Sequence, residues 1–341
     1  MSEKNTLIVG AGAIGGTLAV LMKDAGYAID VLEVYPGAAQ QISEKGLHLT
    51  GAKGEKYAYP TVYASTGELV KSYDYVIVAV KYLNLEAAVK SILPFIHDKS
   101  LVVGMQNGIC TAELAGIVGK ERAVGCMIGF GATKHSSVDI EMTSGGEMFI
   151  GMLDGGTSAE LEYLCKMYNA VLKTQITPCL INKQYSKLII NCCINAVAAI
   201  TGKTLGEILD DKRAQDLFLA IAREGMHIAK AQGIDVPKYG LLLDYRLLML
   251  SNAKWYNNIC KLVVKAVGKG KYASVKPSTL QSLLRGEKTE IDIFNGYLAR
   301  IAEEKGIDAP VNTLLTKMIR EIENGEREMS ADNLEEFRAL I

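Results

Sequence analysis

The stretch TLIVGAGAIGGTLAVLMKDAGYAIDVLEV, residues 6–34, decides the fold of this chain. An apolar run leads into a glycine turn, helical periodicity follows from Leu18, and a second β-type run follows Gly26. This order of strand, turn, helix and strand is typical of the first βαβ unit of a doubly wound sheet. We therefore expect the chain to begin with an α/β domain built on a parallel sheet.

The glycine turn indicates a dinucleotide. Gly10, Gly12 and Gly15 satisfy the G-x-G-x-x-G pattern, which permits a tight turn, a close approach of the backbone to a pyrophosphate, and close packing of helix on strand. Ala13 and Ile14 would then open the helix, whose first N–H groups bind phosphate. A glycine-rich turn without a ligand is the alternative, but the pattern lies inside a complete βαβ unit. We interpret it as a site for NADH or NADPH.

An acidic residue, Glu33, stands at the end of the second strand, eighteen residues after Gly15. A carboxylate at this place accepts a hydrogen bond from the ribose 2′-hydroxyl and repels a 2′-phosphate, which favours NADH over NADPH. In the alternative interpretation Glu33 faces water and a nearby lysine binds the 2′-phosphate.

Two further buried strands are predicted at YDYVIVAV (73–80) and SLVVGMQNGI (100–109). Ligands of such sheets bind beyond the carboxyl ends of the strands. Lys81 and Asn107 lie there, so Lys81 is a candidate for the cofactor and Asn107 for cofactor or substrate. An Asn-Gly dipeptide is also an ordinary turn. The glycine-rich stretch 125–151, with short β-type runs, is expected to close the sheet.

The composition excludes several classes of protein. The formal net charge of −1 leaves no basic excess for a general nucleic-acid binder. Seven cysteines form no C-x-x-C pair and four histidines lie far apart, so we expect free thiols and no metal site. The N-terminus has no long apolar segment of a signal peptide, and no apolar run is long enough to span a bilayer. We expect a cytoplasmic protein.

The pattern changes to long helical runs after Pro178. A chain of 341 residues can form two domains. We predict a dinucleotide-binding domain over residues 1–178 and an all-α domain with the substrate and catalytic groups over residues 179–341.

The helical half opens with KLIINCCINAV, residues 187–197, where an apolar helix has one polar seam. Lys187, Asn191 and Asn195 are each four residues apart, so they lie on one face. They could form the solvent-exposed face of an amphipathic helix. Such faces are usually wider than one residue and are rich in Glu, Gln and Lys. A narrow seam of costly polar groups indicates a cleft that holds a polar ligand.

Two more candidates follow in KPSTLQSLLRGEKTEIDIFNG, residues 276–296. The spacing from Thr289 to Asp292 is typical of a helix N-terminus, where the dipole alone would favour Glu290. A carboxylate also keeps a nearby catalytic lysine protonated and oriented. Ser278 would present a hydroxyl to a substrate carboxylate.

With these blocks in this order, the chain resembles the ketopantoate reductases (2-dehydropantoate 2-reductases) over essentially its whole length. The matching blocks are GAGAIGG (10–16), AVK (79–81), QNG (106–108), KLIINCCINAVAA (187–199), STLQ (278–281) and TEIDIFNG (289–296).

The resemblance implies a Rossmann domain, an all-helical domain, and a site in the cleft between them. It implies that Lys187 is the general acid toward the keto oxygen and that Glu290 positions it. The remaining implied contacts are Asn191, Asn195 and Ser278 for the substrate, Asn107 beside nicotinamide and substrate, and Lys81 for the cofactor.

The chain also differs from the family pattern. Val34 stands where the family usually has an arginine for NADPH, and the family's S-M-x-x-D reads S-T-L-Q-S here, ending at Ser282. The segment 245–286 is rich in Lys and Arg and has no acid; it is either a solvated helix face or a positive rim that attracts an anionic substrate.

The resulting hypothesis is that the protein reduces a 2-oxo acid to a 2-hydroxy acid. The first candidate reaction is the reduction of ketopantoate to pantoate. The alternatives are a D-2-hydroxyacid dehydrogenase acting on branched or aromatic 2-oxo acids, or a nucleotide sensor without catalysis. The apolar helical half is consistent with a homodimer.

Overall fold

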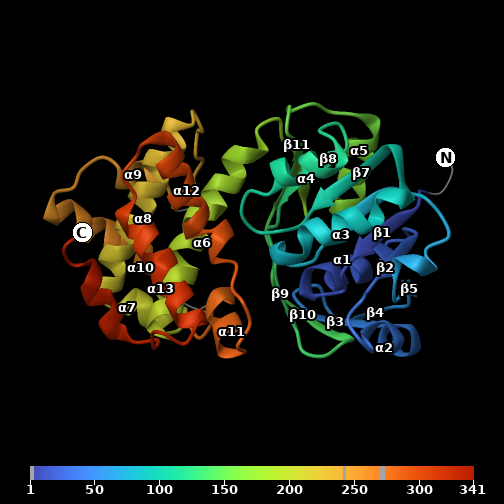
Figure 1. Ribbon diagram of the computed structural model, residues 1–341, viewed down its shortest axis with the longest axis horizontal. Coiled ribbons are helices and arrows are strands. Elements are labelled where there is room, and N and C mark those ends of the chain that lie inside the picture. The colour runs from blue at the N-terminus through green and yellow to red at the C-terminus, as the bar shows by residue number, and fades with distance from the viewer. Residues whose placement is uncertain (1–3, 241–242, 269–272) are drawn as a thin grey trace. The chain divides into compact units, whose positions relative to one another are not determined.

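The computed structural model describes residues 4–240, 243–268 and 273–341. The chain divides into two compact units, Met1–Leu180 and Ile181–Ile341. The first unit, blue to green in Figure 1, is α/β, and the second unit is helical. The predicted fold class, a Rossmann-type domain followed by an all-α domain, is confirmed.

The main sheet has eight strands in the order β12-β11-β8-β7-β6-β1-β2-β5. The strands from β5 to β8 are parallel, and β11 is antiparallel to β8. Their bounds are β1 Thr6–Val9, β2 Ile29–Leu32, β5 Thr61–Tyr63, β6 Tyr73–Val78, β7 Ile96–Gly104, β8 Ala123–Met127, β11 Met148–Met152 and β12 Thr174–Ile176.

The strand order reverses at β1, which pairs with β2 on one side and β6 on the other. Val9 is level with Leu32 and with Val78, so the three strands end side by side. Ligands of open α/β sheets bind at this switch point. The helices of this unit are α1 Ala13–Asp24, α2 Ala38–Lys45, α3 Leu85–Ile92, α4 Thr111–Val118 and α5 Ala159–Asn169, with short 3-10 turns η1 Thr66–Glu68, η2 Tyr82–Asn84 and η3 Leu93–Phe95.

The stretch 125–151 only partly closes the main sheet, which corrects our expectation. Its first and last strands, β8 and β11, join that sheet, but β9 (Gly131–Lys134) and β10 (Asp139–Ser144) form a second sheet with β3 (Leu47–Gly51) and β4 (Lys56–Ala58). The reason lies in the alternation of β10, where Ile140 and Met142 are buried and Asp139, Glu141 and Thr143 beside them are partly or fully exposed. A strand with one solvent-exposed face fits a sheet that is exposed on one side. It does not fit the interior of a sheet that is covered on both faces. Figure 1 shows this second sheet gathered beside α1.

The helical unit is built around α6 (Leu180–Thr201), whose apolar residues Leu188, Ile189, Cys192 and Cys193 are at most 1% exposed. Its other helices are α7 Leu205–Asp210, α8 Lys212–Ala231, α9 Tyr245–Leu248, α10 Lys254–Gly268, α11 Ser278–Leu284, α12 Asn295–Lys305 and α13 Pro310–Glu323, with 3-10 turns η4 Ile291–Ile293 and η5 Ala331–Phe337.

The helix expected to start at Thr289 begins later. The 3-10 turn η4 comes first, and α12 starts only at Asn295. Glu290 is therefore the residue before a short turn, and not a first-turn residue of a long helix.

Candidate functional site

The three glycines of the turn have different surroundings. Gly10 has a φ of +92°, a conformation that other residues rarely adopt. A Cβ atom on Gly15 would lie 2.0 Å from the carbonyl oxygen of Gly10, so helix and turn are in close contact there. A Cβ atom on Gly12 would meet no atom of the described residues within 4 Å. The turn is thus closed on two sides and leaves open space beside Gly12.

That open space lies at the N-terminus of α1. The helix starts at Ala13 and has no acid in its first turn, and no side chain of the described residues caps its first N–H groups. N–H groups of this kind bind phosphate, since they lack partners within the helix. The residues present therefore fit a dinucleotide pyrophosphate, with Ala13 and Ile14 as the donors.

Glu33 is hydrogen-bonded to the backbone of the glycine turn. Its carboxylate accepts hydrogen bonds from the backbone N–H of Ala11 and of Tyr35, both at 2.9 Å. The residue is 8% exposed, so it does not point to water as the alternative interpretation required. Each carboxylate oxygen can accept a second hydrogen bond, which leaves Glu33 able to bind a ribose hydroxyl.

Lys134, at the end of β9, is a site residue that the sequence did not indicate. Its ammonium donates to the carbonyl oxygen of Ala11 at 2.7 Å. Burial lowers the pKa of Lys134, and the negative charge of Glu33 opposes this shift. No local pattern could reveal the contact, because 123 residues separate the two partners.

Lys81 and Asn107 both lie beyond strand ends, as expected. Lys81 is exposed just after β6, and Asn107 is half-buried after β7. Gln106 ties these ends together, because its amide Nε2 donates to the carbonyl oxygens of Val78 at 3.0 Å and Val80 at 2.9 Å. The side-chain amide of Asn107 makes no hydrogen bond to the residues that the structure describes, and is available to a ligand.

The polar seam lies on α6 as predicted. Lys187 and Asn191 are half-buried and Asn195 is 7% exposed, while most residues around them are buried. Ser278, at the start of α11, donates its hydroxyl to the side-chain oxygen of Asn195 at 3.1 Å. Two predicted substrate contacts from distant parts of the sequence are thus neighbours. Lys183 extends the seam by one turn at the same spacing and was missed.

Glu290 belongs to a segment that is held from two sides. Before it, the backbone N–H of Thr289 donates to Glu323 at 2.7 Å. After it, Asn295 at the start of α12 donates to the carbonyl oxygen of Cys192 on α6 at 3.3 Å. The first bond attaches the segment of Glu290 to α13, and the second attaches it to α6, the helix that carries Lys187.

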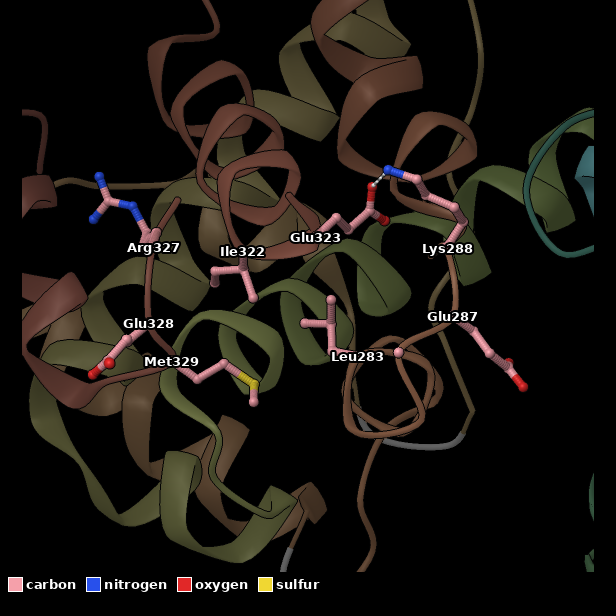
Figure 2. Close-up of a pocket in the computed structure, with 9 residues that line it drawn as sticks. Leu283, Glu287, Lys288, Ile322, Glu323, Arg327, Glu328 and Met329 are labelled. Atoms are coloured by element: carbon pink, nitrogen blue, oxygen red, sulfur yellow. Dashed lines mark ion pairs between the residues drawn. The ribbon is translucent and has the colours of Figure 1, made fainter. Parts of the chain in front are cut away.

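A pocket of about 480 Å³ lies beside this segment and contains none of the predicted site residues. In Figure 2 its apolar centre is formed by Leu283, Ile322 and Met329, and Lys288 points toward Glu323. The ammonium and carboxylate of that pair are 3.5 Å apart, and the Glu323 side chain is 8% exposed. Glu323 therefore anchors the loop before Glu290, through Lys288 and through the backbone of Thr289.

Half of the basic residues in segment 245–286 are paired with acids outside it. Four of its side chains form ion pairs: Arg246 with Asp244, Lys261 with Asp216, Lys265 with Asp210, and Arg285 with Glu287. Lys269 and Lys271 lie outside the described residues. The pairing favours the solvated face over the positive rim.

No helix in the described part of the chain is long and apolar enough to cross a membrane. Within the same residues, no group of three His, Cys, Asp or Glu side chains could hold a metal ion.

Comparison with known proteins identifies a family with this fold. Two family models match, Ketopantoate reductase PanE/ApbA over residues 6–155 and the C-terminal part of the same family over residues 180–323. The chain is 25% identical over 331 residues to a 2-dehydropantoate 2-reductase of Archaeoglobus fulgidus, covering 95% of this chain and 100% of the relative. It is 27% identical over 317 residues to a protein of the same name from Pyrococcus horikoshii, covering 92% and 95%.

Two solved structures have the same fold. One is a D-mandelate dehydrogenase with NADH and anilino(oxo)acetate, with a TM-score of 0.81 at 20% identity over 94% of this chain and 99% of the other. The second is a PanE/ApbA family ketopantoate reductase from Ralstonia eutropha, with a TM-score of 0.80 at 21% identity over 95% and 100%.

Proposed function

The chain belongs to the ketopantoate reductase (PanE/ApbA) family of NAD(P)-dependent oxidoreductases, and from this premise we propose that it reduces a 2-oxo acid to the 2-hydroxy acid. Ketopantoate to pantoate is the first candidate pair, since the relatives compared above have the name 2-dehydropantoate 2-reductase. NADH is the preferred cofactor in this proposal, because Glu33 lies against the glycine turn and Val34 replaces the arginine expected for NADPH.

The observation that carries the proposal is the seam of α6, where Lys187, Asn191 and Asn195 share one face and Asn195 is bonded to Ser278. A nicotinamide bound at the glycine turn would supply the hydride for the keto carbon. Lys187 then stabilises the developing negative charge on the keto oxygen and gives it a proton. The lysine regains its proton from water.

The other residues of the helical unit orient the reacting groups. Glu290 keeps Lys187 protonated and directed, because a nearby carboxylate favours the charged ammonium. Asn191, Asn195 and Ser278 donate and accept hydrogen bonds at the hydroxyl and carboxylate of the substrate. Asn107, which follows β7, would contact nicotinamide and substrate, and Lys81 would contact the cofactor.

A second candidate is a D-2-hydroxyacid dehydrogenase acting on a branched or aromatic 2-oxo acid. It is favoured by Ser282, which stands where the ketopantoate reductase pattern has an aspartate. The D-mandelate dehydrogenase that shares this fold was solved with an aromatic oxo acid, anilino(oxo)acetate.

The test is a kinetic comparison of NADH and NADPH with ketopantoate, 2-oxoisovalerate and benzoylformate. We expect one 2-oxo acid to be reduced with a clearly higher kcat/KM than the others, and NADH to be preferred. Tight nucleotide binding without turnover of any acid would contradict the proposal and favour a sensor. A homodimer and a cytoplasmic location stay predictions, to be checked by light scattering and by cell fractionation.

A further inference from the structure

From the surroundings of Ala11 we infer that Lys134 is a second determinant of cofactor choice, which offsets Glu33 and binds the 2′-phosphate of NADPH. The inference rests on the proposed dinucleotide site. Lys134 adds a positive charge beside the glycine turn, where the sequence motif indicated only the acid Glu33.

The backbone of Ala11 is held at both ends by opposite charges. Its N–H donates to Glu33 at 2.9 Å and its carbonyl oxygen accepts from Lys134 at 2.7 Å. The carboxylate is 8% exposed and the lysine is half-buried, so neither side chain is a freely moving surface group. Both charges therefore stay beside the second residue of the glycine turn.

The ammonium of Lys134 has hydrogen-bonding capacity to spare. An ammonium carries three donors, and within the described residues the oxygen of Ala11 is the one acceptor within hydrogen-bond distance of it. Those residues also place no carboxylate within 4.0 Å of it, Glu33 acting only at longer range. A half-buried ammonium with so few partners costs free energy unless an anion meets it.

The position relative to the turn selects the anion. The pyrophosphate binds at the N-terminus of α1, at Ala13 and Ile14, whereas the acid that ends β2 marks the ribose hydroxyls. The charge of Glu33 also acts on the ammonium of Lys134, so we place Lys134 near the ribose that Glu33 marks. A 2′-phosphate there would meet the repulsion of Glu33 and the attraction of Lys134 together. NADH has no 2′-phosphate, so both effects would be weaker on NADH than on NADPH.

The experiment measures the dissociation constants of NADH and NADPH by calorimetry for the full chain and three variants. For Lys134→Met we expect NADPH binding to weaken about tenfold more than NADH binding, since one charge-assisted hydrogen bond is lost. Lys134→Arg keeps the charge and should restore most of the difference. Glu33→Gln should shift the ratio the other way, toward NADPH.

The matched control is Lys56→Met. Lys56 lies on the same second sheet and is paired at 2.7 Å with Asp24, at the far end of α1 from the turn. The variant Lys56→Met also removes one positive charge, and it should leave the ratio of the NADPH and NADH dissociation constants unchanged. Equal weakening of both nucleotides by Lys134→Met would overturn the inference, since that is the result for a purely structural contact or a pyrophosphate contact. A wild-type protein that binds neither nucleotide would instead refute the dinucleotide site itself.

Discussion

At the scale of single residues, the chemistry depends on a few polar groups set into apolar surroundings. Lys187 and Asn191 are half-buried on a helix whose neighbouring residues are almost fully buried. Polar groups of this kind destabilise a helix bundle unless they meet a partner. We propose that this face meets the substrate, so single substitutions there should affect turnover more than folding.

We expect Lys187→Ala to lower kcat by at least two orders of magnitude, because general acid catalysis contributes about 10²- to 10⁴-fold. The dissociation constant of NADH should change little, since the proposed nucleotide contacts lie in the first unit. Lys230→Ala is the control, an exposed lysine of α8 in the same unit. Steady-state kinetics and nucleotide titration of both variants check this. Undiminished turnover in Lys187→Ala would remove the proposed mechanism.

Alanine variants of Asn191 and Asn195 should differ in their effects on substrate binding and on stability. Asn195→Ala loses the hydrogen bond from Ser278, so the free energy of unfolding should fall by about 1 kcal/mol and KM should rise. The Asn191 side chain makes no hydrogen bond to the described residues. Asn191→Ala should therefore raise KM with little loss of stability. Urea denaturation and kinetics distinguish the two, and an equal loss of stability in both variants would argue against a ligand-facing Asn191.

At the scale of elements, the turn before α1 and the second sheet show how packing positions the site. Gly12 and Gly15 belong to one motif, yet only Gly15 is closed in by its neighbours. The second sheet packs on α1 and delivers Lys134 to the turn. Neither feature follows from the glycine pattern alone.

Alanine at each of these glycines should have opposite effects. Gly15→Ala would place a Cβ atom 2.0 Å from the carbonyl oxygen of Gly10, so the melting temperature should drop markedly. Gly12→Ala should keep its stability, since a Cβ atom there meets nothing within 4 Å and the backbone φ is −67°. Its NADH affinity should fall, because the methyl group enters the space of the pyrophosphate. Thermal unfolding and NADH titration check both variants; a stable, NADH-binding Gly12→Ala would mean that the ligand lies elsewhere.

His48 makes the second sheet sensitive to pH. Its ring nitrogens lie 3.0 Å from Asp139 and 3.0 Å from Glu55, and these carboxylates, Asp139 foremost, raise the pKa of His48 above its ordinary value. A raised pKa means that the stabilisation is complete below about pH 6.5 and is lost as the pH rises through the folded value.

We therefore expect His48→Gln to reduce the free energy of unfolding more at pH 6 than at pH 9, as measured by urea denaturation. His227→Gln, at an exposed position of α8, is the control. A loss that is the same at both pH values would show that the ion pairs of His48 do not stabilise the sheet.

At the scale of the whole molecule, the chain has nearly balanced charge, with 37 basic and 38 acidic residues and an isoelectric point near 6.5. Repulsion between copies is weakest where the net charge is zero. We expect the lowest solubility near pH 6.5, with higher solubility at pH 5 and at pH 8. Light scattering at fixed protein concentration checks this, and a minimum far from pH 6.5 would show that titrating groups are strongly shifted in the folded protein.

The sequence alone determined the classes of both units, the glycine turn and the helix with its polar seam. These features depend on periodicities and motifs that extend over one or two elements, so residues 6–34 and 187–197 carry them locally. The tertiary structure decided that β9 and β10 leave the main sheet, that Ser278 meets Asn195, and that Lys134 reaches Ala11. Each of these joins residues far apart in the chain, and such pairings are selected by packing and burial over the whole fold rather than by local preference.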